Sequence, residues 1–125
     1  MSAPTLFKIA SAINAISIPG HLIMGLTKVY PSLRLLGDRK HAGALAGARN
    51  SWDNVHVLLL INAILNYQWS QTSGPTTQGE KFIVLAMFLA GLPSSIRYFK
   101  AKEYGGVGPM FIAPASTLIA MLMSG

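Results

Sequence analysis

Residues 5–29, TLFKIASAINAISIPGHLIMGLTKV, are an apolar run of helical length whose only charges, Lys8 and Lys28, lie near its two ends. A transmembrane helix needs about 20 predominantly apolar residues, so this run is long enough to cross a bilayer. The flank before it carries no short apolar segment followed by a small-residue cleavage site. We therefore expect a retained membrane span and not a signal peptide.

The composition of the whole chain is also typical of a membrane protein. The 125 residues are 51% hydrophobic and only 11% charged, whereas soluble domains contain about 25% charged residues. The chain has no cysteine, which excludes disulfides, a thiolate nucleophile and cysteine metal sites. The formal net charge is +6, but we do not expect nucleic-acid binding, because basic residues cluster in a short connection as they do in cytoplasmic loops. These residues are Lys28, Arg34, Arg39 and Lys40.

Three further segments of helical length follow the first run. The predicted spans cover residues 5–29, 42–69, 80–99 and 107–124, approximately, in a single domain formed by residues 1–125. Four spans use roughly 80 residues, which leaves no room for an extramembrane domain. The predicted fold is all-α, an integral membrane four-helix bundle. Because the first and third connections are basic and residues 71–79, QTSGPTTQG, carry no charge, we place both termini opposite the cytoplasm.

The second span is unusual because its first half is polar. Arg49 and Asp53 are four residues apart and His56 follows Asp53 by three, so a helix places all three on one face, beside Trp52. Ionisable side chains cost about 2.5–3.5 kcal/mol each at the centre of a span and normally face protein or a water-filled cavity. We therefore expect these three side chains to face the interior of the bundle.

Two interpretations of this polar face stay open. In the functional one, Asp53 is a general acid or base, and Arg49 or His56 sets its protonation state. In the structural one, Arg49 and Asp53 neutralise each other so that the helix can insert, and the nearby asparagines join helices. The candidate catalytic residues are Asp53, Arg49 and His56, and the candidate substrate-binding residues are Trp52, Asn50, Asn54 and His21.

No motif indicates a metal or a cofactor. A metal site would need His21, His56 and Asp53 to converge, and the closer sets usual in helical metal sites, such as HxxxH or ExxH, are missing from the sequence. The sequence also lacks a phosphate loop, a dinucleotide fingerprint and a GxSxG motif. We therefore predict no metal and no cofactor.

Four pieces of the sequence carry a resemblance to a known family. They are Pro31 after the first span, GALAGARNSWDN opening the second, SSIRYFKAKEYGG closing the third and GPMFIAPASTLIAML in the fourth. Together they resemble the small four-helix membrane proteins of the DoxX-like group, a family of unassigned function whose fungal members often lie in secondary-metabolite gene clusters. Such proteins commonly have an acid near the end of the third span, where this chain has Pro93-Ser94-Ser95.

Three functions follow as hypotheses. The first is a small enzyme of the endoplasmic reticulum membrane that cyclises or isomerises a lipophilic polyketide or terpenoid intermediate by acid–base chemistry. The second is a non-catalytic membrane subunit that scaffolds a partner biosynthetic enzyme or carries a solute, alone or as a homo-oligomer. The third is cofactor-free oxygenation, because Trp52 and Asn54 are similar to a pair in the small membrane oxygenases that convert anthrones to anthraquinones.

Overall fold

The chain folds into long helices with short connections. The computed structural model describes residues 1–35, 39–72 and 74–125, so residues 36–38 of the first predicted connection and residue 73 of the second lie outside the described residues. The elements are α1 (Ala3–Met24), the π-helical segment η1 (Gly25–Val29), α2 (Tyr30–Arg34), the 3-10 turn η2 (Arg39–His41), α3 (Ala42–Gln71), α4 (Gln78–Lys100), the 3-10 turn η3 (Tyr104–Gly106), the π-helical segment η4 (Gly108–Ile112) and α5 (Ala113–Ser124).

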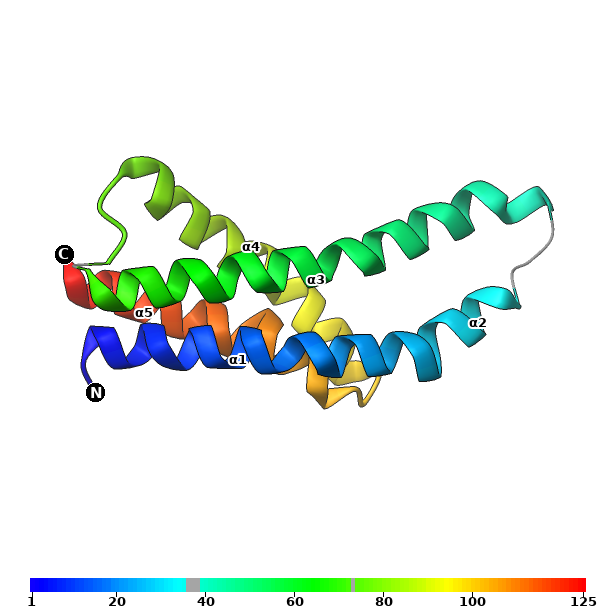
Figure 1. Cartoon of the computed structure of the whole chain (residues 1–125), viewed down its shortest axis with the longest axis horizontal. Helices are drawn as coiled ribbons and strands as arrows, with labels where there is room; N and C mark the ends of the chain where they lie inside the picture. The colour runs from blue at the N-terminus through cyan, green and yellow to red at the C-terminus, as the bar shows by residue number, and fades with distance from the viewer. Residues whose placement is uncertain (36–38, 73) are drawn as a thin grey trace.

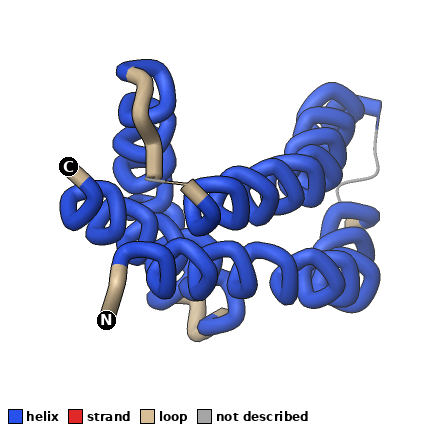
Figure 2. Tube along the Cα trace, turned by 60° about the vertical axis from the view of Figure 1, so that its left-hand side comes forward, coloured by secondary structure: helices blue, strands red, loops and turns tan. Residues whose placement is uncertain are grey.

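These elements form four helical rods. The first rod consists of α1, η1 and α2, which follow one another without a break, and the last consists of η4 and α5. The described residues contain no strand (Figure 2). The predicted all-α, four-helix fold is therefore confirmed.

Three of the rods are long and apolar enough to cross a membrane. They are Ala3–Arg34, Gln78–Lys100 and Tyr104–Ser124. The second rod, α3, has 30 residues but is not one of these three, because polar side chains interrupt its first half. Large apolar side chains on the outside of the rods suit lipid contact, since a water-soluble surface would not present them in such density. Examples are Ile16 on α1, Phe82 and Leu89 on α4 and Leu122 on α5, each more than 60% exposed.

The packed core lies near the end of the molecule that carries both termini (Figure 1). Phe7 of α1, Trp69 of α3, Val84 of α4 and Ala120 of α5 form a buried apolar cluster in which all four rods meet. A buried polar contact reinforces it, because Thr117 Oγ1 donates a hydrogen bond to Asn66 Oδ1 at 2.7 Å. The four rods are thus fixed at this end.

The other end is open because the rods differ in length. The first rod has 32 residues and α4 has 23, which correspond to about 48 Å and 35 Å at 1.5 Å per residue. As a result α2 and the start of α3 extend past the ends of α4 and α5, as both views show (Figures 1 and 2). We call this extension, residues 30–34 and 42–53, the arm.

Candidate functional site

A cluster of three aromatic side chains joins α1 to α3 where the arm begins. The rings of His21 and Trp52 are stacked, with centroids 3.8 Å apart and an interplanar angle of 15°. The ring of His56 meets that of His21 edge-on, with centroids 4.6 Å apart. His21 Nδ1 and His56 Nε2 lie 3.3 Å apart, within hydrogen-bond distance. The two helices therefore bring together His21, Trp52 and His56, which we call the histidine cluster.

The hydrogen bonds show which nitrogen of each histidine ring in the cluster carries a hydrogen. His56 Nδ1 lies 3.1 Å from the main-chain carbonyl oxygen of Asp53, which can only accept, so this nitrogen carries a hydrogen. The Nε2 of a neutral His56 is then an acceptor, and His21 Nδ1 donates to it. This assignment rests on the network of partners. It leaves His21 Nε2 with a free lone pair, which is the form of a base.

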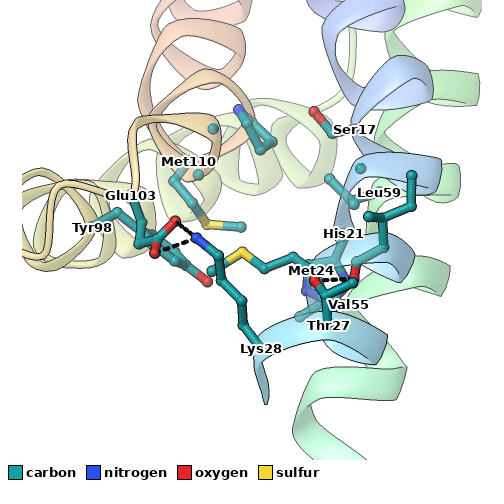
Figure 3. A pocket seen from close by; sticks show the side chains of 15 residues that line it. Ser17, His21, Met24, Thr27, Lys28, Val55, Leu59, Tyr98, Glu103 and Met110 are labelled. Carbon is teal, nitrogen blue, oxygen red and sulfur yellow. Dashed lines mark hydrogen bonds and ion pairs between the residues drawn. The ribbon is translucent and has the colours of Figure 1, made fainter. Parts of the chain in front are cut away.

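His21 of the histidine cluster lines a cavity of about 290 Å³. One wall comes from α1 and η1, another from η3 and η4, and Val55 and Leu59 of α3 contribute the third. Met24 and Met110 reach toward each other over this space (Figure 3). Thr27 and Lys28 belong to η1 and Pro109 and Met110 to η4, so the cavity lies between the two π-helical segments.

An ion pair lies at the edge of this cavity (Figure 3). Lys28 Nζ donates to both carboxylate oxygens of Glu103, at 2.6 and 2.8 Å. The two side chains are 58% and 34% exposed, and pairs of this kind contribute only about 0–1 kcal/mol. Because this contribution is small, little free energy is needed to separate the two side chains. Both residues also line the cavity.

The charged residues predicted on α3 lie outside this cavity. Asp53 is exposed, and its Oδ1 accepts a hydrogen bond from the Tyr30 hydroxyl. Among the described side chains the ion pair within 4 Å is that of Lys28 and Glu103, so Arg49 and Asp53 do not neutralise each other by direct contact. The expected interior position of Asp53 is not observed, because α4 and α5 end before they reach the arm.

The remaining predicted residues divide between the cavity and the surface. His21 lines the cavity, Trp52 packs on His21, and Asn50 and Asn54 are exposed away from it. Arg49 lies with Asp53 in a second, shallower pocket on the arm. Within the described residues, no three His, Asp or Glu side chains lie together in a way that could hold a metal ion.

Four residues of these sites were not singled out from the sequence. Tyr30 was placed in a connection because Pro31 follows it, but proline is tolerated in the first turn of a helix, and α2 starts at Tyr30. Lys28 and Glu103 carry opposite charges in the first and third connections, a signal that could have paired them. Tyr98, which lines the cavity, falls at the end of the predicted third span, where tyrosine is common because it suits the membrane interface.

Comparisons of the chain with known proteins identify no relative. No family model, no curated protein and no solved structure matches the chain. The function must therefore be argued from the geometry of the site itself.

The position of Trp52 against η1 leads to a first prediction. A Cβ atom added at Gly25 would lie 2.6 Å from Trp52 Nε1, so the substitution Gly25→Ala must push the indole away from His21. We expect a loss of stability of about 1–3 kcal/mol, as is usual for overpacking, together with a shift in tryptophan fluorescence. Thermal unfolding and emission spectra of the purified protein measure both. Gly47→Ala on α3 is the control, since no atom lies within 4 Å of its Cβ, and equal behaviour of the two variants would contradict the prediction.

Proposed function

We propose that this protein is a membrane enzyme that moves a proton within a lipophilic small molecule, in an isomerisation or cyclisation. The observation that carries the proposal is the His21–His56 hydrogen bond at the wall of a largely apolar cavity. A base next to an apolar binding space is what proton abstraction from carbon requires, because a positioned side chain must reach the proton in the bound substrate.

The chemistry follows from the proton assignment in the cluster. In a β,γ-unsaturated ketone, His21 Nε2 removes a proton from the α carbon. The electron pair of the C–H bond forms a carbon–carbon double bond of a dienolate, and the π pair of the carbonyl group moves to its oxygen. The carbonyl group re-forms when the proton returns to the γ carbon, which gives the conjugated isomer, so neither an oxidant nor a reductant is needed. His56 holds the His21 ring and shares the positive charge that forms. Tyr98 and Lys28 are the donors on the cavity wall that could stabilise an enolate oxygen.

The substrate class belongs to the same proposal. A cavity of about 290 Å³ is just below the range of about 300–1,000 Å³ usual for small-molecule sites. Its methionines adapt to irregular apolar shapes, which suits a compact polyketide or terpenoid skeleton. Two further parts of the proposal rest on the sequence alone: membership of the DoxX-like group and a location in the endoplasmic reticulum membrane.

The test uses ketone probes whose α-proton exchange needs no knowledge of the natural substrate. The full chain in phosphatidylcholine vesicles is incubated in D₂O with a set of alkylated β,γ-unsaturated ketones. We expect faster deuterium uptake and faster conversion to the conjugated ketone than in protein-free vesicles, measured by mass spectrometry and ultraviolet absorbance. Retention of the ketones by the protein without any acceleration would contradict the enzyme and favour the alternative of a carrier.

Asp53 provides a second prediction, because its spacing in the sequence favours it as the base whereas the lining of the cavity favours His21. Its carboxylate lies on the arm with Tyr30 and does not line the cavity. We therefore expect the loss of exchange rate in Asp53→Asn to be at least about tenfold smaller than the loss in His21→Gln, where a general base worth 10²–10⁴-fold is removed. The two variants are compared in the same vesicle assay. A larger loss in Asp53→Asn would make Asp53 the base and contradict the assignment to His21.

A further inference from the structure

The arm carries a second pocket that the proposed function does not use. It has a volume of about 300 Å³ and is lined by Tyr30, Arg34, Arg49 and Asp53. None of these residues lines the cavity beside His21. We call it the arginine pocket, and its two arginines come from different helices, α2 and α3.

The charges in the arginine pocket favour an anion. Two guanidinium groups are present with a single carboxylate, and Asp53 Oδ1 already accepts a hydrogen bond from the Tyr30 hydroxyl. Among the described residues neither arginine forms an ion pair within 4 Å. Among the residues that line the pocket, positive charge therefore exceeds negative charge, and no carboxylate of the described residues neutralises either guanidinium by direct contact.

Arg49 also carries an unsatisfied donor. Its Nε is buried and has no hydrogen-bond partner among the described residues. No hydrogen bond from the Arg49 side chain to a described residue is observed, and hydrogen bonds to charged groups are the strongest that a guanidinium can form. A guanidinium presents its N–H groups as a planar fork that matches the oxygens of a phosphate. Two such forks from α2 and α3 suit a phosphate group that has three oxygens available.

The position of the pocket on the arm agrees with this ligand. The pocket is lined by residues of α2 and α3, and these two helices extend past the end of α4 (Figure 1). Arg34 is the last residue of the first membrane-length rod, Ala3–Arg34. At 1.5 Å per residue this rod is about 48 Å long, which exceeds the hydrocarbon core of about 30 Å. Its ends therefore extend past the core toward the headgroups, where basic pockets between helices bind anionic lipids.

We propose that the arginine pocket binds a phosphate group with at least three unesterified oxygens, with Arg34 and Arg49 as the two ligating side chains. The phosphate is either the monoester headgroup of an anionic lipid of the surrounding leaflet or inorganic phosphate from the adjoining aqueous phase. Occupation of the site ties α2 to α3, and so orders the arm that the rest of the bundle leaves uncovered.

The experiment uses the full chain in phosphatidylcholine nanodiscs containing phosphatidic acid, a phosphate monoester, or phosphatidylglycerol, a diester. Native mass spectrometry measures how much of each lipid the protein retains, and thermal unfolding measures stabilisation by inorganic phosphate against chloride at equal ionic strength. We expect Arg49→Gln and Arg34→Gln each to lower retention of phosphatidic acid by about tenfold or more, the size of one charged hydrogen-bonding partner. Arg97→Gln on α4 makes the same change of charge outside the pocket and should retain the lipid.

The outcomes separate the two sources of phosphate and can overturn the site. Retention of phosphatidic acid that inorganic phosphate does not displace supports the lipid, whereas stabilisation by inorganic phosphate in pure phosphatidylcholine, lost in Arg49→Gln, supports a free phosphate. Equal losses in Arg97→Gln and the pocket variants would show general charge attraction and overturn the proposal, as would a wild-type protein that neither retains phosphatidic acid nor responds to phosphate. If Arg49→Gln does not fold, the exposed Arg34→Gln decides by itself.

Discussion

Replacing His21 with glutamine should lower proton exchange in the ketone probes by about a hundredfold or more. Glutamine keeps a polar side chain on the cavity wall, but its amide does not take up a proton at neutral pH. The loss therefore reports the base itself, and removal of a general base costs 10²–10⁴-fold in rate. The vesicle assay in D₂O measures the effect directly as the rate of deuterium uptake.

Two further variants make this prediction specific. His56→Gln keeps a group that can accept from His21 Nδ1, so we expect a smaller loss, of about tenfold, since only the sharing of charge is impaired. His41→Gln is the matched control because His41 does not line the cavity. An exchange rate in His21→Gln within a factor of about three of the wild type, for a protein with unchanged thermal unfolding, would remove His21 from the mechanism.

The substitution Gly91→Ala should destabilise the bundle by about 3 kcal/mol or more, the upper end of the usual cost of overpacking. A Cβ atom at Gly91 of α4 would lie far inside the 3.0 Å limit of real contacts with the Met110 carbonyl oxygen of η4. This oxygen belongs to the backbone and cannot rotate away, so α4 and η4 must separate. Pro114 has no N–H to offer the Met110 carbonyl four residues earlier, which is one reason why this carbonyl is free to approach another helix.

The measurement is thermal unfolding in detergent, followed by loss of helical circular dichroism. Gly79→Ala on the same helix is the control, because the nearest atom to its Cβ is Thr77 Oγ1 at 3.9 Å. The control should match or exceed the wild type in stability, since alanine is a better helix former than glycine. If Gly91→Ala unfolds together with the control, α4 and η4 do not pack as closely as the structure shows.

The all-α fold could be predicted because its signal is carried by long apolar runs. Residues 82–92, FIVLAMFLAGL, have no polar side chain, and only a buried or lipid-facing helix tolerates such a run. The predicted third span begins at residue 80, whereas α4 begins at Gln78. The sequence signal for the observed start is the pair Thr77 and Glu80, which form a capping box in which each side chain bonds the other's main chain. The different lengths of the rods could not be predicted from the sequence, because the ends of α1 and α3 are set by packing and not by composition.

The candidate site was predicted only in part. The sequence placed Trp52, Asp53 and His56 together because helical spacing is local information. It could not show that His21 stacks on Trp52, because that contact depends on how α1 and α3 are aligned, and the two residues are 31 positions apart in the sequence. Helical spacing alone made Asp53 a candidate acid or base. Its contact with Tyr30 could not be predicted, because that contact depends on where the first rod ends.

The two π-helical segments on either side of the cavity have a consequence for how such a site can change. A π-helical turn closes its hydrogen bond over five residues and not four, so it contains one residue more than an α-helical turn. That residue turns everything after it by about 100° relative to an uninterrupted α-helix. In η1 this rotation decides which side of the rod Lys28 and Tyr30 occupy relative to His21. Deleting a single residue from η1 would leave the apolar end of the bundle in register. It would also turn a different set of side chains toward the cavity. The chemistry of the site can therefore change by one deletion while the fold is kept.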